Sequence, residues 1–306
     1  MIHNIQHLSA DLIDRDKWDE WVGKAMNRRI YASSLCLDNF SPRWEALVMD
    51  DGKAFMPVTG NRKYWIKYVY QPLFVQQLGF FCRDDSYLSV LPFFIEKLSS
   101  LYRFIDISLN EMNDMLISGY TLSPMSNYLL WMDKPYEFIY KGYSSNTRRN
   151  LRKAERLNIK LISGYKPSKI ISLFAENNGK NLPNIRKMNY KRLYDFLVRG
   201  VADGFIITRA ARAENGDVIA AACFLRDYDR YVFYFSANTG EGKMQGAMFM
   251  IIDSFIKEYA GNGMMLDFNG SMKPGLARFY KGFGALGTCY RRLKVNRLNF
   301  PLNVLK

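Results

Sequence analysis

The two halves of this 306-residue chain repeat one order of secondary-structure signals, and this repetition restricts the possible fold more than any other feature. The first half predicts a helix, a hairpin, further strands, a helix and a strand, at residues 16–27, 45–59, 64–70 with 73–81, 84–99 and 104–109. The second half predicts the same order at residues 190–202, 204–226, 230–236, 245–260 and 264–268. The helices are predicted from apolar residues at three-and-four spacing, and the hairpins from Asp-Gly and Asn-Gly turns. A period of about 155 residues is too long for a solenoid, so the pattern predicts two duplicated α/β domains.

Composition indicates a globular protein, because 48% of its residues are hydrophobic, which suffices for a packed core. No window approaches the roughly 20 apolar residues that span a bilayer, and the first residues lack the pattern of a signal peptide, so we expect a cytoplasmic protein. The four cysteines are widely separated, and both histidines, His3 and His7, lie near the amino terminus. This spacing predicts neither a disulfide framework nor a metal site.

The chain carries 43 Lys and Arg against 29 Asp and Glu, a formal net charge of +14. Such a surface attracts polyanions, which include nucleic acid, a nucleotide-bearing precursor and an anionic membrane face. Charge alone does not choose among these partners, and many basic proteins bind no nucleic acid specifically.

The stretch 239–284 contains the arrangement whose chemistry can be argued most directly. Gly240, Gly242 and Gly246 lead into the predicted helix 245–260. A glycine-rich helix start presents free N–H groups and partial positive charge, which suit a phosphate or diphosphate. The alternative is that Gly246 only begins a well-packed helix. After the strand 264–268, a second predicted helix carries Phe279, Tyr280 and Lys281.

These residues resemble a known family. Gln245-Gly246-Ala247 at a helix start, followed one strand later by the segment 277–284, resembles the acyl-CoA-binding half of the GNAT acyltransferase superfamily. The segment 267–271 and the basic segment 144–154 resemble the Fem-type branch, the tandem GNAT enzymes related to FemAB and to peptidoglycan-bridge synthesis. The resemblance implies an α/β (α+β) fold of two GNAT-like domains, each a mixed, mostly antiparallel sheet flanked by helices. We place the first domain at residues 1–135 and the second, with the basic joining helix, at 136–306.

The resemblance also implies an N-acyltransferase that moves an acyl or aminoacyl group to an amine without a metal. The donor would be a thioester or ester, either an acyl-CoA such as acetyl-CoA or an aminoacyl-tRNA. The donor would bind at Lys243, Gln245, Gly246 and Ala247. Tyr280 matches the family tyrosine that protonates the leaving thiolate, and a phenol of pKa near 10 suits that role. A tyrosine packed on the last strand is the alternative. The Fem-like pattern often has a lysine near this position, and Lys281 would contact substrate.

Two carboxylates are candidates for handling the proton of the attacking amine. Asp267 ends a strand predicted to be buried, and Asp106 stands at the corresponding place in the first half. A desolvated carboxylate has a raised pKa and accepts a proton more readily. Asp267 could instead cap the helix that opens near Pro274.

Five cations fall on one predicted helix at intervals of one and four residues: Arg148, Arg149, Arg152, Lys153 and Arg156. With only Glu155 to balance them, they favour anion binding over a merely solvated face, and we count Arg148, Arg149 and Arg152 as substrate-binding.

Two other functions stay open. The first is aminoacyl-tRNA-dependent transfer to a cell-wall precursor, since Met248 stands where the usual acyl-CoA pattern ends in a small residue. The second is a non-catalytic protein that binds nucleic acid or an anionic membrane surface.

Overall fold

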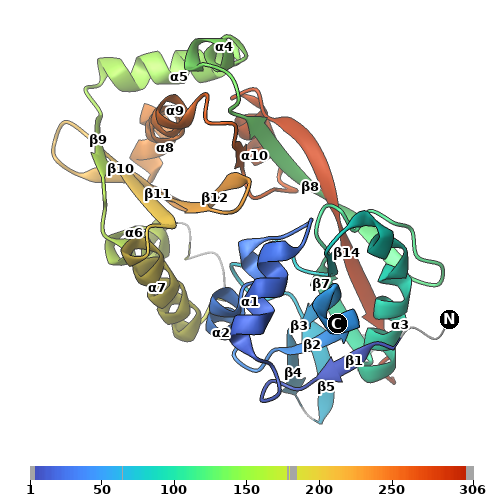
Figure 1. Cartoon of the computed structure of the whole chain (residues 1–306). Coiled ribbons are helices and arrows are strands. Elements are labelled where there is room, and N and C mark those ends of the chain that lie inside the picture. The colour runs from blue at the N-terminus through green and yellow to red at the C-terminus, as the bar shows by residue number, and fades with distance from the viewer. Residues whose placement is uncertain (1–3, 64, 178, 180–184, 301–306) are drawn as a thin grey trace. The chain divides into compact units, whose positions relative to one another are not determined.

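The computed structural model describes residues 4–63, 65–177, 179 and 185–300, and the chain divides into two compact units (Figure 1). Unit 1 comprises residues 1–125 and the residues from Cys289 onward, and unit 2 comprises Ser126–Thr288. The predicted division after residue 135 therefore falls inside unit 2. Residues from Cys289 onward group with unit 1 because Arg292–Asn296 pair antiparallel with Phe104–Ser108.

The helices and strands of unit 1 follow the predicted order. They are β1 (Gln6–Leu8), α1 (Arg15–Lys24), α2 (Ser34–Phe40), β2 (Glu45–Met49), β3 (Ala54–Val58), β4 (Gly60–Lys63), β5 (Ile66–Tyr70), β6 (Phe81–Cys82), α3 (Leu91–Leu101), β7 (Phe104–Ser108) and the second part of β14 (Leu286–Asn296). Short 3-10 turns occupy Ile30–Ala32, Asp50–Gly52 and Asp85–Val90.

Unit 1 has two groups of strands with a shared core. The strands β1, β2, β3 and β6 pair in that order, and β5 pairs with β7 in parallel. The inward faces of β2, β3 and α3 supply the core, with Phe94, Ile95 and Leu98 of α3 buried as their spacing predicts. A parallel pair requires a crossover, and α3 provides it.

Three buried asparagines replace strand pairing around Phe80. Its carbonyl oxygen accepts hydrogen bonds from the Nδ2 atoms of Asn27, Asn110 and Asn113, at 2.8, 2.7 and 3.0 Å. Its N–H donates to Asn113 Oδ1, at 2.9 Å. The predicted strand 73–81 is therefore wrong over most of its length. It is reduced to a bridge between Leu78 and Leu109 and to the short β6, because side chains satisfy the backbone groups in between.

We predict that Asn110→Ala lowers the free energy of unfolding by about 2–3 kcal/mol, because it leaves buried backbone carbonyls with fewer donors. The Asn110 amide donates to the carbonyls of Leu78 and Phe80 and is 1% exposed. Urea denaturation followed by tryptophan fluorescence measures the change. The matched control is Asn61→Ala, since Asn61 is exposed on β4. Equal losses in the two variants would contradict a structural role for the asparagine cluster.

Unit 2 repeats the order of unit 1. Its elements are β8 (Thr121–Trp131), which begins in unit 1, α4 (Tyr136–Lys141), α5 (Ser145–Arg156), β9 (Lys160–Ser163), α6 (Pro167–Asn177), α7 (Lys187–Ala202), β10 (Ile206–Arg212), β11 (Val218–Arg226), β12 (Arg230–Asn238), α8 (Gly240–Gln245), α9 (Ala247–Tyr259), β13 (Met265–Asp267), α10 (Pro274–Lys281) and the start of β14.

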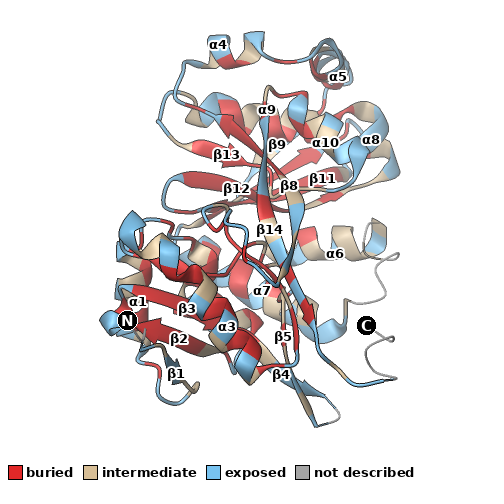
Figure 2. Ribbon diagram, turned by 90° about the vertical axis from the view of Figure 1, so that its right-hand side faces the viewer, coloured by how far each residue is buried: buried red, intermediate tan, exposed pale blue. Residues whose placement is uncertain are grey.

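The sheet of unit 2 is mixed and mostly antiparallel, which confirms the predicted fold class. Strands β9 to β12 pair antiparallel in the order β9-β10-β11-β12, and β12 pairs with β13 in parallel. Helices α6 and α7 cover one face, and α9 covers the other with α5 outside it (Figure 1). Because both faces are covered, β11 is buried almost throughout (Figure 2). Phe224 of β11 stacks on Phe255 of α9 with ring centroids 3.8 Å apart.

The predicted helix 245–260 corresponds to α9, which runs from Ala247 to Tyr259, and a short helix, α8, precedes it. Thr239 caps α8, its hydroxyl accepting from Gly242 N at 2.9 Å, and Gly246 ends α8 in a left-handed conformation with φ of 78°. The sequence did not predict α8. In the part of the chain that the structure describes, no helix is both long enough and apolar enough to cross a membrane.

Candidate functional site

Unit 2 contains a cavity of about 440 Å³ where β12, the α8–α9 junction and α10 meet. Its apolar wall comes from Phe174, Phe233, Met248, Phe249, Leu276 and Phe279. Its polar groups are Ser236, Asn238, Lys243 and Tyr280, with Gly242 and Gly246 between them. A mostly apolar cleft with a few convergent polar groups is the usual form of a small-molecule site.

The cavity exists because β12 and β13 separate. They pair only from Arg230 with Met265 to Val232 with Asp267, whereas β12 continues to Asn238, paired there with β11 alone. Among the described residues, no strand pairs with this edge of β12 beyond Val232. On this side of residues 233–238, the side chain of Asn269 donates from Nδ2 to the Tyr234 carbonyl oxygen at 3.4 Å. An extended ligand can hydrogen-bond to the edge of a strand.

The sequence did not single out Ser236 and Asn238, which line this opening. The available signal was their spacing of two residues, which places both on one face of a strand that runs on to residue 238. The predicted strand ended at residue 236, so this part of the wall was missed.

Of the four predicted donor-binding residues, Lys243 and Gly246 line the cavity. Gln245 and Ala247 are not among its lining residues. The Gln245 amide donates to Glu241 Oε1 at 2.7 Å along α8, and Ala247 is buried in the core. The N–H groups of Lys243 and Gly246 donate to Thr239 O and Gly242 O, so α8 uses part of the predicted phosphate cradle for itself.

Gly246 is required by its conformation and by a close neighbour. A Cβ added there would lie 2.8 Å from the Asn150 carbonyl oxygen of α5. The junction that forms the cavity edge is thus held directly against α5.

We predict that Gly246→Ala destabilises the protein more than Gly261→Ala does. Both glycines have φ near 78°, but a Cβ at Gly261 meets nothing within 4 Å. Gly261→Ala should cost about 1–2 kcal/mol for its left-handed backbone alone. Gly246→Ala should cost about 1–3 kcal/mol more, because α5 must shift. Parallel urea denaturation of the two variants measures the difference, and equal costs would rule out the contact.

Tyr280, the predicted proton donor, lies on the cavity wall. It is 6% exposed and its ring stacks on Phe268 with centroids 4.8 Å apart. Burial raises the pKa of the Tyr280 phenol to about 12. The hydroxyl therefore stays protonated at neutral pH and can donate a proton.

Asp267 is held in a buried network and is not a free base, so the structure argues against the predicted proton-accepting role. Its Oδ2 accepts from Arg230 Nη1 at 3.2 Å and from Asn127 Nδ2 at 3.1 Å. Its Oδ1 accepts from the backbone N–H of Asn269 at 2.8 Å. The side chains of Asp267 and Arg230 are each 3% exposed. Both carboxylate oxygens of Asp267 are therefore already occupied by donors from within the protein.

Asp106 is likewise held in an ion pair. Arg292 of β14 donates Nε to Oδ1 at 2.6 Å and Nη2 to Oδ2 at 2.8 Å. Asp106 does correspond to Asp267 by position, since each lies on the strand that follows the crossover helix and pairs in parallel with the strand before it. At corresponding positions, each half of the chain thus has an aspartate that is paired with an arginine, and such a pair suits a structural role.

The predicted substrate cations lie outside the cavity. Arg148, Arg149 and Arg152 belong to α5, whose cap Ser144 accepts from Thr147 N. Lys281 lies over the Tyr128 ring, 5.8 Å from its centroid. Within the described residues, no group of three His, Cys, Asp or Glu side chains could hold a metal ion.

No protein-family model and no curated protein matches the sequence, but solved structures match its fold. The chain is similar to FemX with a TM-score of 0.66 and 12% identity, covering 98% of this chain and 99% of FemX. The fold is Fem-like, with two compact units.

Two further chains have this Fem-like fold over nearly their whole length. L-PGS from Bacillus licheniformis has a TM-score of 0.58 and 12% identity, covering 95% of this chain and 94% of that one. The C-terminal domain of a putative lysylphosphatidylglycerol synthetase from Agrobacterium fabrum has a TM-score of 0.55 and 9% identity, with coverage of 94% and 95%. These comparisons confirm the fold that the motifs predicted.

Proposed function

We propose that this protein transfers an acyl or aminoacyl group from a thioester or ester donor to an amine, with the reactive end of the donor in the unit 2 cavity. The observation that carries the proposal is the opening between β12 and β13, with Tyr280 on its wall. In this arrangement the edge of β12, the apolar wall and the candidate proton donor all border the same cavity.

The chemistry needs few groups because the donor is already activated. The amine nitrogen attacks the carbonyl carbon, and the oxyanion that forms can accept hydrogen bonds from backbone N–H groups of β12. The bond from carbon to the leaving sulfur or oxygen then breaks, and Tyr280 gives its proton to the leaving atom. The attacking nitrogen releases one proton, which restores the phenol through solvent.

We propose acyl-CoA, such as acetyl-CoA, as the donor. Lys243 is exposed beside the cavity and forms no ion pair with the described residues, so its ammonium group can meet a phosphate. The apolar wall from Phe174 to Phe279 suits a pantetheine chain and a small acyl group.

An aminoacyl donor is the second candidate, and one observation favours it. The N–H groups of Lys243 and Gly246 are already used inside α8, which leaves fewer donors for a diphosphate. One of the chains with this fold carries the name lysylphosphatidylglycerol synthetase, which is consistent with this candidate.

Calorimetric titration with acetyl-CoA, longer acyl-CoAs and aminoacyl-tRNA tests both candidates. The matched variants are Leu276→Glu and Leu286→Glu, because both leucines are exposed but only Leu276 lines the cavity. We expect saturable binding of an acyl-CoA that Leu276→Glu weakens about tenfold by charge repulsion, and that Leu286→Glu leaves unchanged. Binding of aminoacyl-tRNA without any CoA would favour the second candidate. Binding unaffected by Leu276→Glu would place the donor elsewhere.

A further inference from the structure

Helix α5 presents an uninterrupted basic face. Its buried residues are Thr147, Leu151 and Ala154, and they face α9. At about 100° per residue, the five cations fall on the remaining side of the helix. They are Arg148, Arg149, Arg152, Lys153 and Arg156, and none forms an ion pair within the described part of the chain. This set is called the α5 face below.

Apolar side chains flank the α5 face at both ends. Phe138 of α4 is 60% exposed, and Leu157, the residue directly after α5, is 38% exposed. Lys141 lies over the Phe138 ring, with Nζ 5.2 Å from its centroid. Helices α4 and α5 lie together at one edge of unit 2 in both views (Figures 1 and 2). Cations beside exposed apolar side chains match an interface where charge meets headgroups and apolar groups enter the acyl boundary.

The three tyrosines of this region are buried or half-buried. Tyr136 donates to Asp253 at 2.8 Å, and Tyr143 is 2% exposed. The half-buried Tyr140 packs against both, with ring centroids 5.7 and 5.1 Å away. The aliphatic Leu157 adds no stacking surface either. Single-stranded nucleic acid sites combine cations with exposed aromatic platforms, and here Phe138 is the one exposed aromatic side chain of α4 and α5. A lipid surface can contact both Phe138 and Leu157, whereas a nucleic acid base can stack only on the Phe138 ring.

We propose that the α5 face docks this protein on an anionic phospholipid bilayer, with Phe138 and Leu157 entering the headgroup region. The inference goes beyond the proposed transfer reaction, because α5 contributes no lining residue to the cavity.

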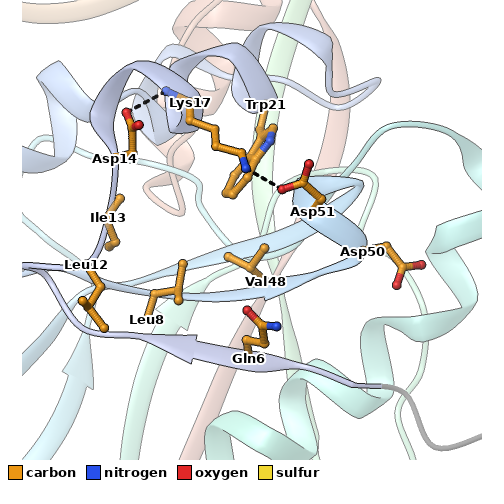
Figure 3. A pocket seen from close by; sticks show the side chains of 10 residues that line it. All are labelled: Gln6, Leu8, Leu12, Ile13, Asp14, Lys17, Trp21, Val48, Asp50 and Asp51. Carbon is orange, nitrogen blue, oxygen red and sulfur yellow. Dashed lines mark hydrogen bonds and ion pairs between the residues drawn. The ribbon is translucent and has the colours of Figure 1, made fainter.

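A second cavity, of about 290 Å³ in unit 1, does not compete as a site (Figure 3). Its one cation, Lys17, pairs with Asp51 at 2.6 Å and lies over Trp21. Asp14 accepts from the backbone N–H groups of Asp16 and Lys17, and Asp50 accepts from the Tyr87 hydroxyl. The charged groups that line this cavity are thus already paired, whereas the cations of α5 have no carboxylate partner among the described residues.

Vesicle co-sedimentation with the full chain tests the docking. One set of vesicles is pure phosphatidylcholine, and the other is a roughly 3:1 mixture of phosphatidylcholine and phosphatidylglycerol. Binding to each is measured at roughly physiological salt and at high salt. The test variant combines Arg149→Gln, Arg152→Gln and Lys153→Gln. The matched control combines Lys166→Gln, Lys169→Gln and Lys187→Gln, which removes the same charge from exposed positions before and on α6 and α7, on the other face of the sheet.

We expect binding to the phosphatidylglycerol vesicles that the α5 variant weakens about 100-fold, since each of the three cations contributes about a factor of five at such a surface. The control should bind within a few-fold of the parent chain. Phe138→Ser should also weaken vesicle binding while leaving circular dichroism unchanged.

The proposal is overturned if anionic vesicles are not bound, or if both triple variants lose equal affinity. It is also overturned if bulk tRNA, titrated in parallel, is bound through the α5 face and vesicles are not. Each readout is independent of acyl transfer, so failure of the proposed function leaves this test intact.

Discussion

Tyr280→Phe is expected to lower kcat about 100-fold with little change in KM, because general acid catalysis typically contributes a factor of this size. The phenylalanine ring keeps the stack on Phe268 and the cavity wall, so only the proton donor is lost. Steady-state kinetics with the donor identified by titration measures the effect. Tyr128→Phe is the control, since its ring centroid lies 5.8 Å from that of Tyr280 but Tyr128 does not line the cavity.

The pH dependence separates a proton donor from a proton acceptor at this position. Because burial raises the pKa of Tyr280 to about 12, the proton to be donated is present throughout the range from neutral to about pH 10. A donor role therefore predicts no fall in kcat over that range, and it predicts that Tyr280→Phe matters least for donors whose leaving group is a weak base. A phenolate acting as base would instead give a rate that climbs tenfold per pH unit toward 12, in the parent chain only.

Arg230→Met is expected to lower the free energy of unfolding by about 3–5 kcal/mol, the usual cost of leaving a buried charge without its partner. Both side chains of the Arg230–Asp267 pair are 3% exposed, and water cannot replace the lost guanidinium without opening the core. Urea denaturation of the purified variant measures the loss. The double variant Arg230→Met with Asp267→Leu should recover most of it, because it removes both charges together.

Asp267→Asn distinguishes the structural role from the catalytic one. A structural carboxylate predicts lower stability, with kcat within a few-fold of the parent chain at a temperature where the variant is folded. A loss of 100-fold or more in kcat at full folding would restore Asp267 as the base, against the geometry of its three donors.

The repeated order of helices and strands could be predicted from the sequence, because each of these elements depends on residues that are close together in the chain. The Asn215-Gly216 turn, the Ser144 cap and the buried stripe of α9 each depend on neighbours a few residues away. The resemblance at 245–247 and 277–284 added the fold family, and Gly246 and Tyr280 from these segments line one cavity in the structure.

Long-range contacts decided the rest, and sequence spacing does not encode them. The charge partners of Asp267 and Asp106 are Arg230 and Arg292, which lie 37 and 186 residues away. The three asparagines that hold Phe80 likewise come from distant segments.

The sequence by itself determined that the chain is a duplicated α/β protein with a basic helix before its second half, because periodicity, caps and turns are local physics. Only the tertiary structure decided which polar residues face the open edge of β12 and which are used up inside the protein. From sequence alone, a carboxylate in an open site cannot be told from one that is buried in an ion pair. Burial and ion pairing depend on segments that meet only in the folded chain.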